Sequence, residues 1–217
     1  MALKIFEYKV YKRTFLKYVR WLFSYKAEED KFVKRFVEEM KALSFWEVRK
    51  ETKAVMMKKQ GIMVLANAEL LFVNCATDVY QGFNVIRSEL ISLLKILEKL
   101  GIQEIKYINC VKENSYTIDK SKLKTGLTES QFADILFTDS FAAKPPYVES
   151  RDGIQVLVTR SFSDSITESS MQLLVTVYWG ADLPLSAASD KLEQMDKASY
   201  DAWSSVISDE LKQLMER

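Results

Sequence analysis

The 217-residue sequence contains no histidine. Histidine is the commonest general base near neutral pH and the commonest metal ligand, so its absence excludes serine–histidine–aspartate triads and most zinc sites. Glycine is also scarce, with six residues, and no two glycines lie within five positions of each other. Phosphate-binding loops and dinucleotide fingerprints need closely spaced glycines, so both kinds of nucleotide site are excluded as well.

Cysteine and long apolar runs are also in short supply. Cys75 and Cys110 are the two cysteines, and each follows an apolar run, which predicts buried thiols and not a disulfide framework. The longest apolar stretch, residues 61–76, is interrupted by two asparagines and a glutamate. It falls short of the roughly 20 apolar residues that a membrane-spanning helix needs. Because the first residues also differ from a signal peptide, we expect a cytoplasmic protein without a transmembrane segment.

Charge is nearly balanced in total but not along the chain. The sequence has 31 basic and 30 acidic side chains, a formal net charge of +1. Residues 1–60 hold 16 basic and 8 acidic side chains, whereas residues 127–217 hold 7 and 15. The two ends of the chain therefore carry opposite charge. Whether these charges neutralise each other depends on whether the fold brings the two regions together.

Apolar residues recur every three or four positions in three segments, which predicts three helices. The second of these helices is the clearest, and Gly101 stands where a left-handed residue often follows a helix end. The predicted helices cover residues 32–43, residues 83–100 and about seven turns after Pro184.

Alternating or uninterrupted apolar residues predict strands around these helices. The predicted strands are 3–10, continuing to a turn near Tyr25, then 46–58, 61–66, 69–76, 102–111, 154–158 and 171–179. Residues 112–128 indicate a hairpin or loop, residues 131–137 a short strand or helix, and residues 138–153 a long exposed loop.

Runs of strands without intervening helices predict an α+β fold, because parallel sheets need a helix after nearly every strand. We expect one or more antiparallel sheets with three helices. The helix-then-strands order occurs twice, which allows two similar halves. Residues 1–217 are predicted to form a single domain, with two lobes, 1–76 and 77–217, as the alternative.

The N-terminal region interleaves basic and aromatic side chains. Single-stranded nucleic acid is held by this combination, through base stacking and phosphate contacts. Two other interpretations remain open: an amphipathic strand whose aromatic side chains fill the core, and a segment that contacts a membrane surface or a protein. The candidate nucleic-acid or partner contacts are Lys9, Lys12, Arg13, Lys17, Tyr18, Arg20 and Trp21.

The sequence contains two weak candidates for a catalytic or metal-binding group. Ser121 and Lys124 have the spacing of serine–lysine enzymes, but they lie in a polar segment and such pairs arise by chance in a chain rich in both residues. Asp190, Glu193 and Asp196 recur at three-residue spacing, which suits oxygen ligation of Mg²⁺, yet a solvated helix face explains them better. We therefore predict no catalytic residue, no metal ligand and no cofactor. A carboxylate- or metal-dependent enzyme is the least favoured alternative.

The segment from the second helix through Gly101 to Asn109 resembles the helix, glycine and Arg-Tyr-Ile-Asn strand of a sporadically distributed prokaryotic family of uncharacterised proteins. The resemblance covers residues 45–112 and 170–215. Lys106 stands where the family has arginine, and the family's proline-containing N-terminal strand is missing. The resemblance implies an α+β prokaryotic protein in a mobile-element or defence context, and it supplies no catalytic residues.

These observations favour a non-enzymatic protein-interaction module. Its partner is expected to be another protein or a second copy of the same chain. A nucleic-acid-binding module that uses the basic, aromatic N-terminal region is the alternative from a different class.

Overall fold

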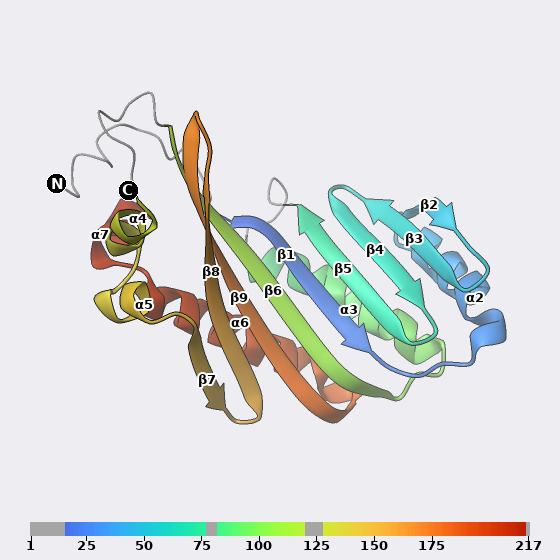
Figure 1. The fold of residues 1–217 in the computed structure, drawn as a ribbon. Coiled ribbons are helices and arrows are strands. Elements are labelled where there is room, and N and C mark those ends of the chain that lie inside the picture. Colours follow the sequence, from blue (N-terminus) through green and yellow to red (C-terminus); the bar gives the residue numbers. More distant parts are fainter. Residues whose placement is uncertain (1–15, 77–81, 120–127, 216–217) are drawn as a thin grey trace.

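The computed structural model describes residues 16–76, 82–119 and 128–215. Nine strands form one antiparallel sheet in the order β2-β3-β4-β5-β1-β6-β9-β8-β7 (Figure 1). The fold is therefore α+β with a large antiparallel sheet, as predicted. The strands are β1 (Leu16–Ser24), β2 (Trp46–Lys50), β3 (Ala54–Lys59), β4 (Ile62–Asn67), β5 (Leu70–Ala76), β6 (Glu104–Asp119), β7 (Tyr147–Arg151), β8 (Ile154–Asp164) and β9 (Glu168–Pro184).

Six α-helices occur in the described residues, so the prediction of three helices was an undercount. The three predicted helices are present, although the third is divided in two. α4 occupies residues that were predicted as a short strand or helix, and α5 was missed because it is too short to show an apolar period. The helices are α2 (Glu29–Ala42), α3 (Phe83–Lys99), α4 (Glu129–Leu136), α5 (Asp139–Ala143), α6 (Ala188–Val206) and α7 (Asp209–Met215). Gly101 follows α3 with φ +88°, which confirms the predicted left-handed position.

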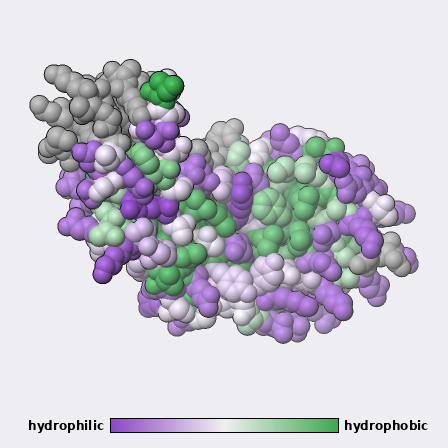
Figure 2. All heavy atoms as spheres, in the orientation of Figure 1, coloured by the Kyte–Doolittle hydropathy of each residue, from purple (hydrophilic) through white to green (hydrophobic). Residues whose placement is uncertain are grey.

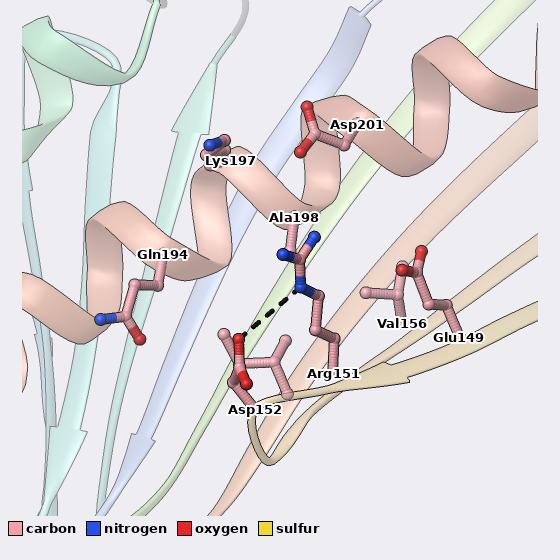
Figure 3. Close-up of a pocket in the computed structure, with 9 residues that line it drawn as sticks. Glu149, Arg151, Asp152, Val156, Gln194, Lys197, Ala198 and Asp201 are labelled. Carbon is pink, nitrogen blue, oxygen red and sulfur yellow. Dashed lines mark ion pairs between the residues drawn. The ribbon is translucent and has the colours of Figure 1, made fainter.

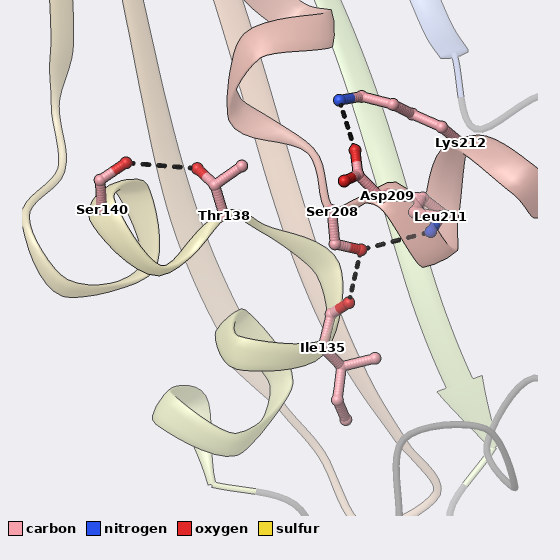
Figure 4. A network of polar contacts seen from close by, with 7 residues as sticks. All are labelled: Ile135, Thr138, Ser140, Ser208, Asp209, Leu211 and Lys212. Atoms are coloured by element: carbon pink, nitrogen blue, oxygen red, sulfur yellow. Dashed lines mark hydrogen bonds and ion pairs between the residues drawn. The ribbon is translucent and has the colours of Figure 1, made fainter.

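The predicted C-terminal helix is divided into α6 and α7 by Ile207 and Ser208 (Figure 4). Ile207 is extended and forms an isolated bridge with Phe137, which follows α4. The Ser208 hydroxyl donates to the carbonyl of Ile135 at 2.9 Å and accepts from the amide of Leu211 at 3.2 Å. Ser208 thus caps α7 and ties it to α4, a contact between distant segments that the helical period alone cannot reveal.

Residues 138–153 form α5 and β7, so the prediction of a long exposed loop was wrong there. β7 is an edge strand that pairs along its whole length with β8. The backbone hydrogen bonds of β7 are made with β8. The sequence of β7 alternates only weakly between apolar and polar residues, so it gave little indication of a strand. Residues 46–58 also differ from the prediction, because they form two strands, β2 and β3, joined by a turn.

The sheet consists of two halves with the same order of elements. In the first half β1 leads through α2 to the meander β2–β5 and then to α3. In the second half β6 leads through α4 and α5 to the meander β7–β9 and then to α6. β1 and β6 pair at the centre of the sheet, with β5 and β9 on their outer sides. The division lies between α3 and β6, whereas the predicted lobe boundary at residues 76 and 77 falls between β5 and α3.

The core lies between the sheet and the helices. Figure 1 shows α2, α3 and α6 behind the sheet. Alternate strand side chains point toward these helices and are excluded from solvent, as in Val19, Trp21 and Phe23 of β1. The apolar stripe of α3 faces the same layer, which includes the buried Leu90 and Leu93. Burial of this layer supplies the main hydrophobic stabilisation of the fold.

Candidate protein-binding surface

One face of the sheet carries no helix within the described residues, and we call it the open face. Figure 2 shows this face, with hydrophobic side chains gathered over β3–β5 and again over β8 and β9. Strand register and alternation assign its side chains. They include Tyr18, Arg20, Leu22, Trp46, Arg49, Met56, Lys58, Met63, Leu65, Leu70, Phe72, Asn74, Tyr107, Asn109, Val111, Glu113, Val148, Gln155, Leu157, Thr159, Gln172, Leu174, Thr176 and Tyr178. The same register adds Ser24, Ser115, Ser150, Ser161, Ser170 and Glu168, which lie nearer the strand ends or are small.

The large side chains of the open face are mainly apolar and aromatic. Methionine, leucine and phenylalanine dominate its β3–β5 part, and Trp46 at the β2 edge is 51% exposed. On the other half Leu157 is 40% exposed and Val148 is 68% exposed. This composition matches the cores of protein interfaces, where aromatic residues, methionine and arginine are enriched and lysine and carboxylates are depleted.

A polar cluster occupies the centre of the open face, on β5, β1 and β6. The Arg20 guanidinium carbon lies 3.6 Å from the centre of the Tyr18 ring, and Arg20 Nε donates to Asn74 Oδ1 at 3.2 Å. The Tyr18 hydroxyl donates to the Glu113 carboxylate. Burial first, and then this hydrogen bond, raises the pKa of Tyr18. The cluster therefore holds one guanidinium in a defined position among apolar neighbours.

The structure separates the predicted contact residues. Lys9, Lys12 and Arg13 lie outside the described residues, and Lys17 lies in β1. Tyr18 and Arg20 reach the centre of the open face. Trp21 points to the helix side, is 1% exposed and belongs to the core, so in this fold it is not available to a base or to a partner.

Sequence reasoning missed most of the open face, although a signal for it was present. An antiparallel strand with one solvated face alternates apolar and polar residues. β4 and β5 instead contain nearly uninterrupted apolar runs, such as Ile62–Ala66. Such runs are typical of strands that are covered on both faces. The helices cover one side of these strands, and the second apolar side is the open face.

Part of the opposite charge of the chain lies at opposite edges of the sheet. Residues 25–60, which contain α2, β2 and β3, hold 10 basic and 7 acidic side chains, whereas residues 128–206 hold 5 and 12. These regions include opposite edges of the sheet. Nine strands spaced about 4.8 Å apart span about 38 Å, several times the screening length at physiological salt. The charges at these two edges therefore do not neutralise each other within the described part of one chain.

Two of the three α6 carboxylates at three-residue spacing, Glu193 and Asp196, have structural partners. Glu193 pairs with Arg87 of α3 at 2.5 Å, and Asp196 pairs with Lys112 of β6 at 2.5 Å. Within the described ranges, no group of three or more carboxylate or cysteine side chains is placed to hold a metal ion. The three-residue spacing that suggested a cation site instead ties α6 to α3 and β6.

A groove of about 220 Å³ lies between α6 and the β7–β8 hairpin (Figure 3). Arg151 and Asp152 extend from the hairpin with their ionic groups 3.7 Å apart, and both side chains are more than 80% exposed. Lys197 and Asp201 line the opposite wall on α6. Because these charges alternate in sign and the ion pair on the hairpin is solvated, the groove resembles a hydrated rim more than a ligand site.

We expect both thiols to be inert in the folded protein. Cys75 and Cys110 are free and buried, and burial raises the pKa of each thiol to about 12. At about pH 8 such a shift leaves roughly a thousandfold less thiolate than an ordinary cysteine has, and the thiolate is the reactive form. Labelling with a chromogenic disulfide should give no reaction in native buffer and two thiols in denaturant. Rapid labelling of either native thiol would contradict the burial seen here.

The same shifts predict how stability depends on pH. In the unfolded chain the thiols ionise near about pH 8.5, whereas in the folded chain they remain protonated to about pH 12. Their contribution is fully present below the unfolded value and is lost as pH rises toward 12. Denaturant titrations from pH 8 to 11 should show that the free energy of unfolding falls less steeply with pH for a Cys75→Ala/Cys110→Ala variant than for the wild type. The variant has no buried thiols, so it lacks this source of pH dependence.

No helix in the described ranges is both long and apolar enough to cross a bilayer. No family model matches the chain, and no curated protein matches it, so the resemblance drawn from residues 101–109 stays a prediction. The crystal structure of the ligand-free regulatory subunit of aspartate kinase from Thermus thermophilus is similar over 86% of this chain and 93% of that one. Identity is 10% and the TM-score is 0.23, a level that supports no argument about fold or function.

Proposed function

We propose that this chain is a protein-interaction module that binds a protein partner through the open face. The observation that carries the proposal is a sheet face that has apolar and aromatic side chains on either side of a central polar cluster and that no described helix covers. Contiguous apolar surface of this kind marks interaction sites in soluble proteins. The proposal keeps the class expected from the sequence and moves the interface from the N-terminal region to the whole face.

The size of the open face suits a stable interface. Nine strands span about 38 Å, and five residues along each strand rise about 17 Å. The footprint is therefore about 650 Å², close to the roughly 800 Å² that each partner buries in an interface of standard size. Trp46, Phe72 and Tyr178 provide large side chains distributed over both halves, which is how binding energy is usually concentrated.

Nucleic acid fits the described part of this face less well. Outside bulges and strand ends, its described cations are Arg20, Arg49 and Lys58, and Arg49 already pairs with Glu51 at 2.6 Å. Nucleic-acid sites typically combine about six to ten phosphate contacts with stacking residues. The open face has aromatic side chains for stacking, but these three cations are few for such phosphate contacts, and its leucine, methionine and valine side chains provide neither.

Site-specific photo-crosslinking tests this function. A photoreactive phenylalanine analogue at position 72 reports on the open face, and the same analogue at position 95 reports on the solvent side of α3. In the source cells we expect discrete protein adducts from position 72 that persist after nuclease treatment, and none from position 95. Adducts that disappear with nuclease indicate nucleic acid, and equal adducts from both positions contradict the proposal.

Gly180 offers a way to alter the face without disturbing the core. The Tyr178 ring folds over Gly180, and a Cβ at position 180 would overlap that ring. Tyr178 also packs on Tyr107 with ring centroids 5.9 Å apart. Because Tyr178 is exposed and can rotate away, Gly180→Ala should change the free energy of unfolding by less than about 1 kcal/mol. NMR should show a shifted Tyr107 ring signal, and Tyr178→Phe should keep the wild-type position.

A further inference from the structure

We infer that the partner presents a carboxylate flanked by apolar side chains, and that Arg20 binds this carboxylate at the centre of the open face. The inference rests on the proposed function and names the chemistry of the partner. An aspartate or glutamate side chain in an apolar segment of another protein has this chemistry.

Arg20 is held in place but not saturated. Its guanidinium lies on the Tyr18 ring, and Nε donates to Asn74. In the described part of the chain, no hydrogen-bond or ion-pair partner is present for its two terminal nitrogens. Those nitrogens form a planar fork that matches the two oxygens of a carboxylate. Since Tyr18 and Asn74 already fix the side chain, little rotational freedom remains to be lost on binding.

The charge around Arg20 favours a negative occupant. Glu113 is the carboxylate that register places beside it, and Glu113 is 8% exposed beneath the Tyr18 hydroxyl. Glu168, which register also places on this face, lies away from Arg20 at the start of β9. Arg49 is paired with Glu51. Among the described residues, Arg20 and Lys58 are therefore two cations on this surface that form no ion pair. An apolar partner without an acidic group would bury the Arg20 charge unpaired, which is strongly unfavourable.

The neighbours of Arg20 determine what lies beside the carboxylate. Val111 is its cross-strand partner on β6, and Asn74 is its partner on β5. Leu22, two residues along β1, pairs with Phe72. A carboxylate that reaches Arg20 is thus surrounded by apolar side chains on two sides. Exclusion of water by these side chains strengthens the charged hydrogen bonds.

Selection from a library of random peptides displayed on phage tests the inference with the complete chain as target. We expect enriched peptides to contain aspartate or glutamate among leucine, valine or aromatic residues. Synthetic versions should bind the wild type, as measured by fluorescence anisotropy. Arg20→Gln should weaken binding about tenfold to a hundredfold, which is the loss of a charge-assisted pair. Arg20→Lys should retain part of it, and the control Lys95→Gln on α3 should retain all of it.

Each other outcome has a defined meaning. Peptides that bind the open face, with loss on Phe72→Asp but no acidic preference and no loss on Arg20→Gln, overturn the inference and leave the proposed function standing. Peptides that bind equally well to the Phe72→Asp variant overturn both. A dimer in sedimentation velocity that dissociates on Arg20→Gln identifies a second copy as the occupant instead. Binding of a single-stranded oligonucleotide with the same Arg20 dependence assigns the face to nucleic acid and overturns the inference.

Discussion

Replacing Trp21 with alanine is expected to lower the free energy of unfolding by about 3–5 kcal/mol. The Trp21 ring is 1% exposed and packs near Phe23 and Phe83, with ring centroids 6.4 Å and 5.9 Å away. Removing it deletes a large apolar side chain at the centre of the sheet and leaves a cavity that β1 cannot close without losing its pairing with β5 and β6.

Equilibrium unfolding in denaturant, followed by circular dichroism, measures this loss. Trp21→Phe is the matched control: it keeps an aromatic ring and removes an indole N–H that has no hydrogen-bond partner in the described structure. We expect less than half of the alanine effect for this variant. An alanine variant that keeps wild-type stability but loses partner binding would return Trp21 to the contact role suggested by its sequence neighbours.

Replacing Asp196 with alanine is expected to lower the free energy of unfolding by about 3 kcal/mol. The pair that Asp196 forms with Lys112 joins α6 to β6, and the side chains are only 21% and 13% exposed. Without Asp196 the Lys112 ammonium remains on the helix side of the sheet without its counter-charge. Leaving one buried charge unpaired destabilises a protein far more than the intact pair stabilises it relative to two apolar side chains.

Two further variants isolate the effect of burial. Asp209→Ala removes an ion pair with Lys212 in which Asp209 is 85% exposed, and it should cost less than about 0.5 kcal/mol. Lys112→Met/Asp196→Leu replaces both charges with apolar groups and should recover most of the stability. If the single and double variants at this pair are equally unstable, packing of the side-chain stems and not the unpaired charge explains the loss.

The elements that the sequence predicted well are those with strong local periodicity. α3 has an apolar stripe along its whole length, and β8 and β9 alternate clearly, so local pattern suffices for both. α4, α5 and β7 depend on contacts with α7 and β8, which lie elsewhere in the chain. Such elements have no local signal strong enough to predict them.

The candidate site shows the same division. Tyr18 and Arg20 were predicted as contacts because they belong to a segment rich in basic and aromatic residues. Side chains alternate between the two faces of a strand, and this rule alone would have placed Trp21 on the opposite face from both. The open face itself could be suspected from the unbroken apolar runs of β4 and β5. The network that fixes Arg20 could not be predicted from the sequence. Asn74 and Glu113 lie on β5 and β6, and only the fold shows that these strands are the neighbours of β1.

The central pairing of β1 with β6 has a consequence for synthesis of the chain. When the residues through α3 have left the ribosome, the first half can form strands β2–β5 and β1, but the outer edge of β1 then has no partner. Unpaired edges recruit strands from other molecules. Because β6 follows α3 almost at once, it closes the edge of β1 early, but the outer edge of β6 then has no partner until β9 is made. The nascent chain is therefore most prone to aggregate between the completion of β6 and the arrival of β9.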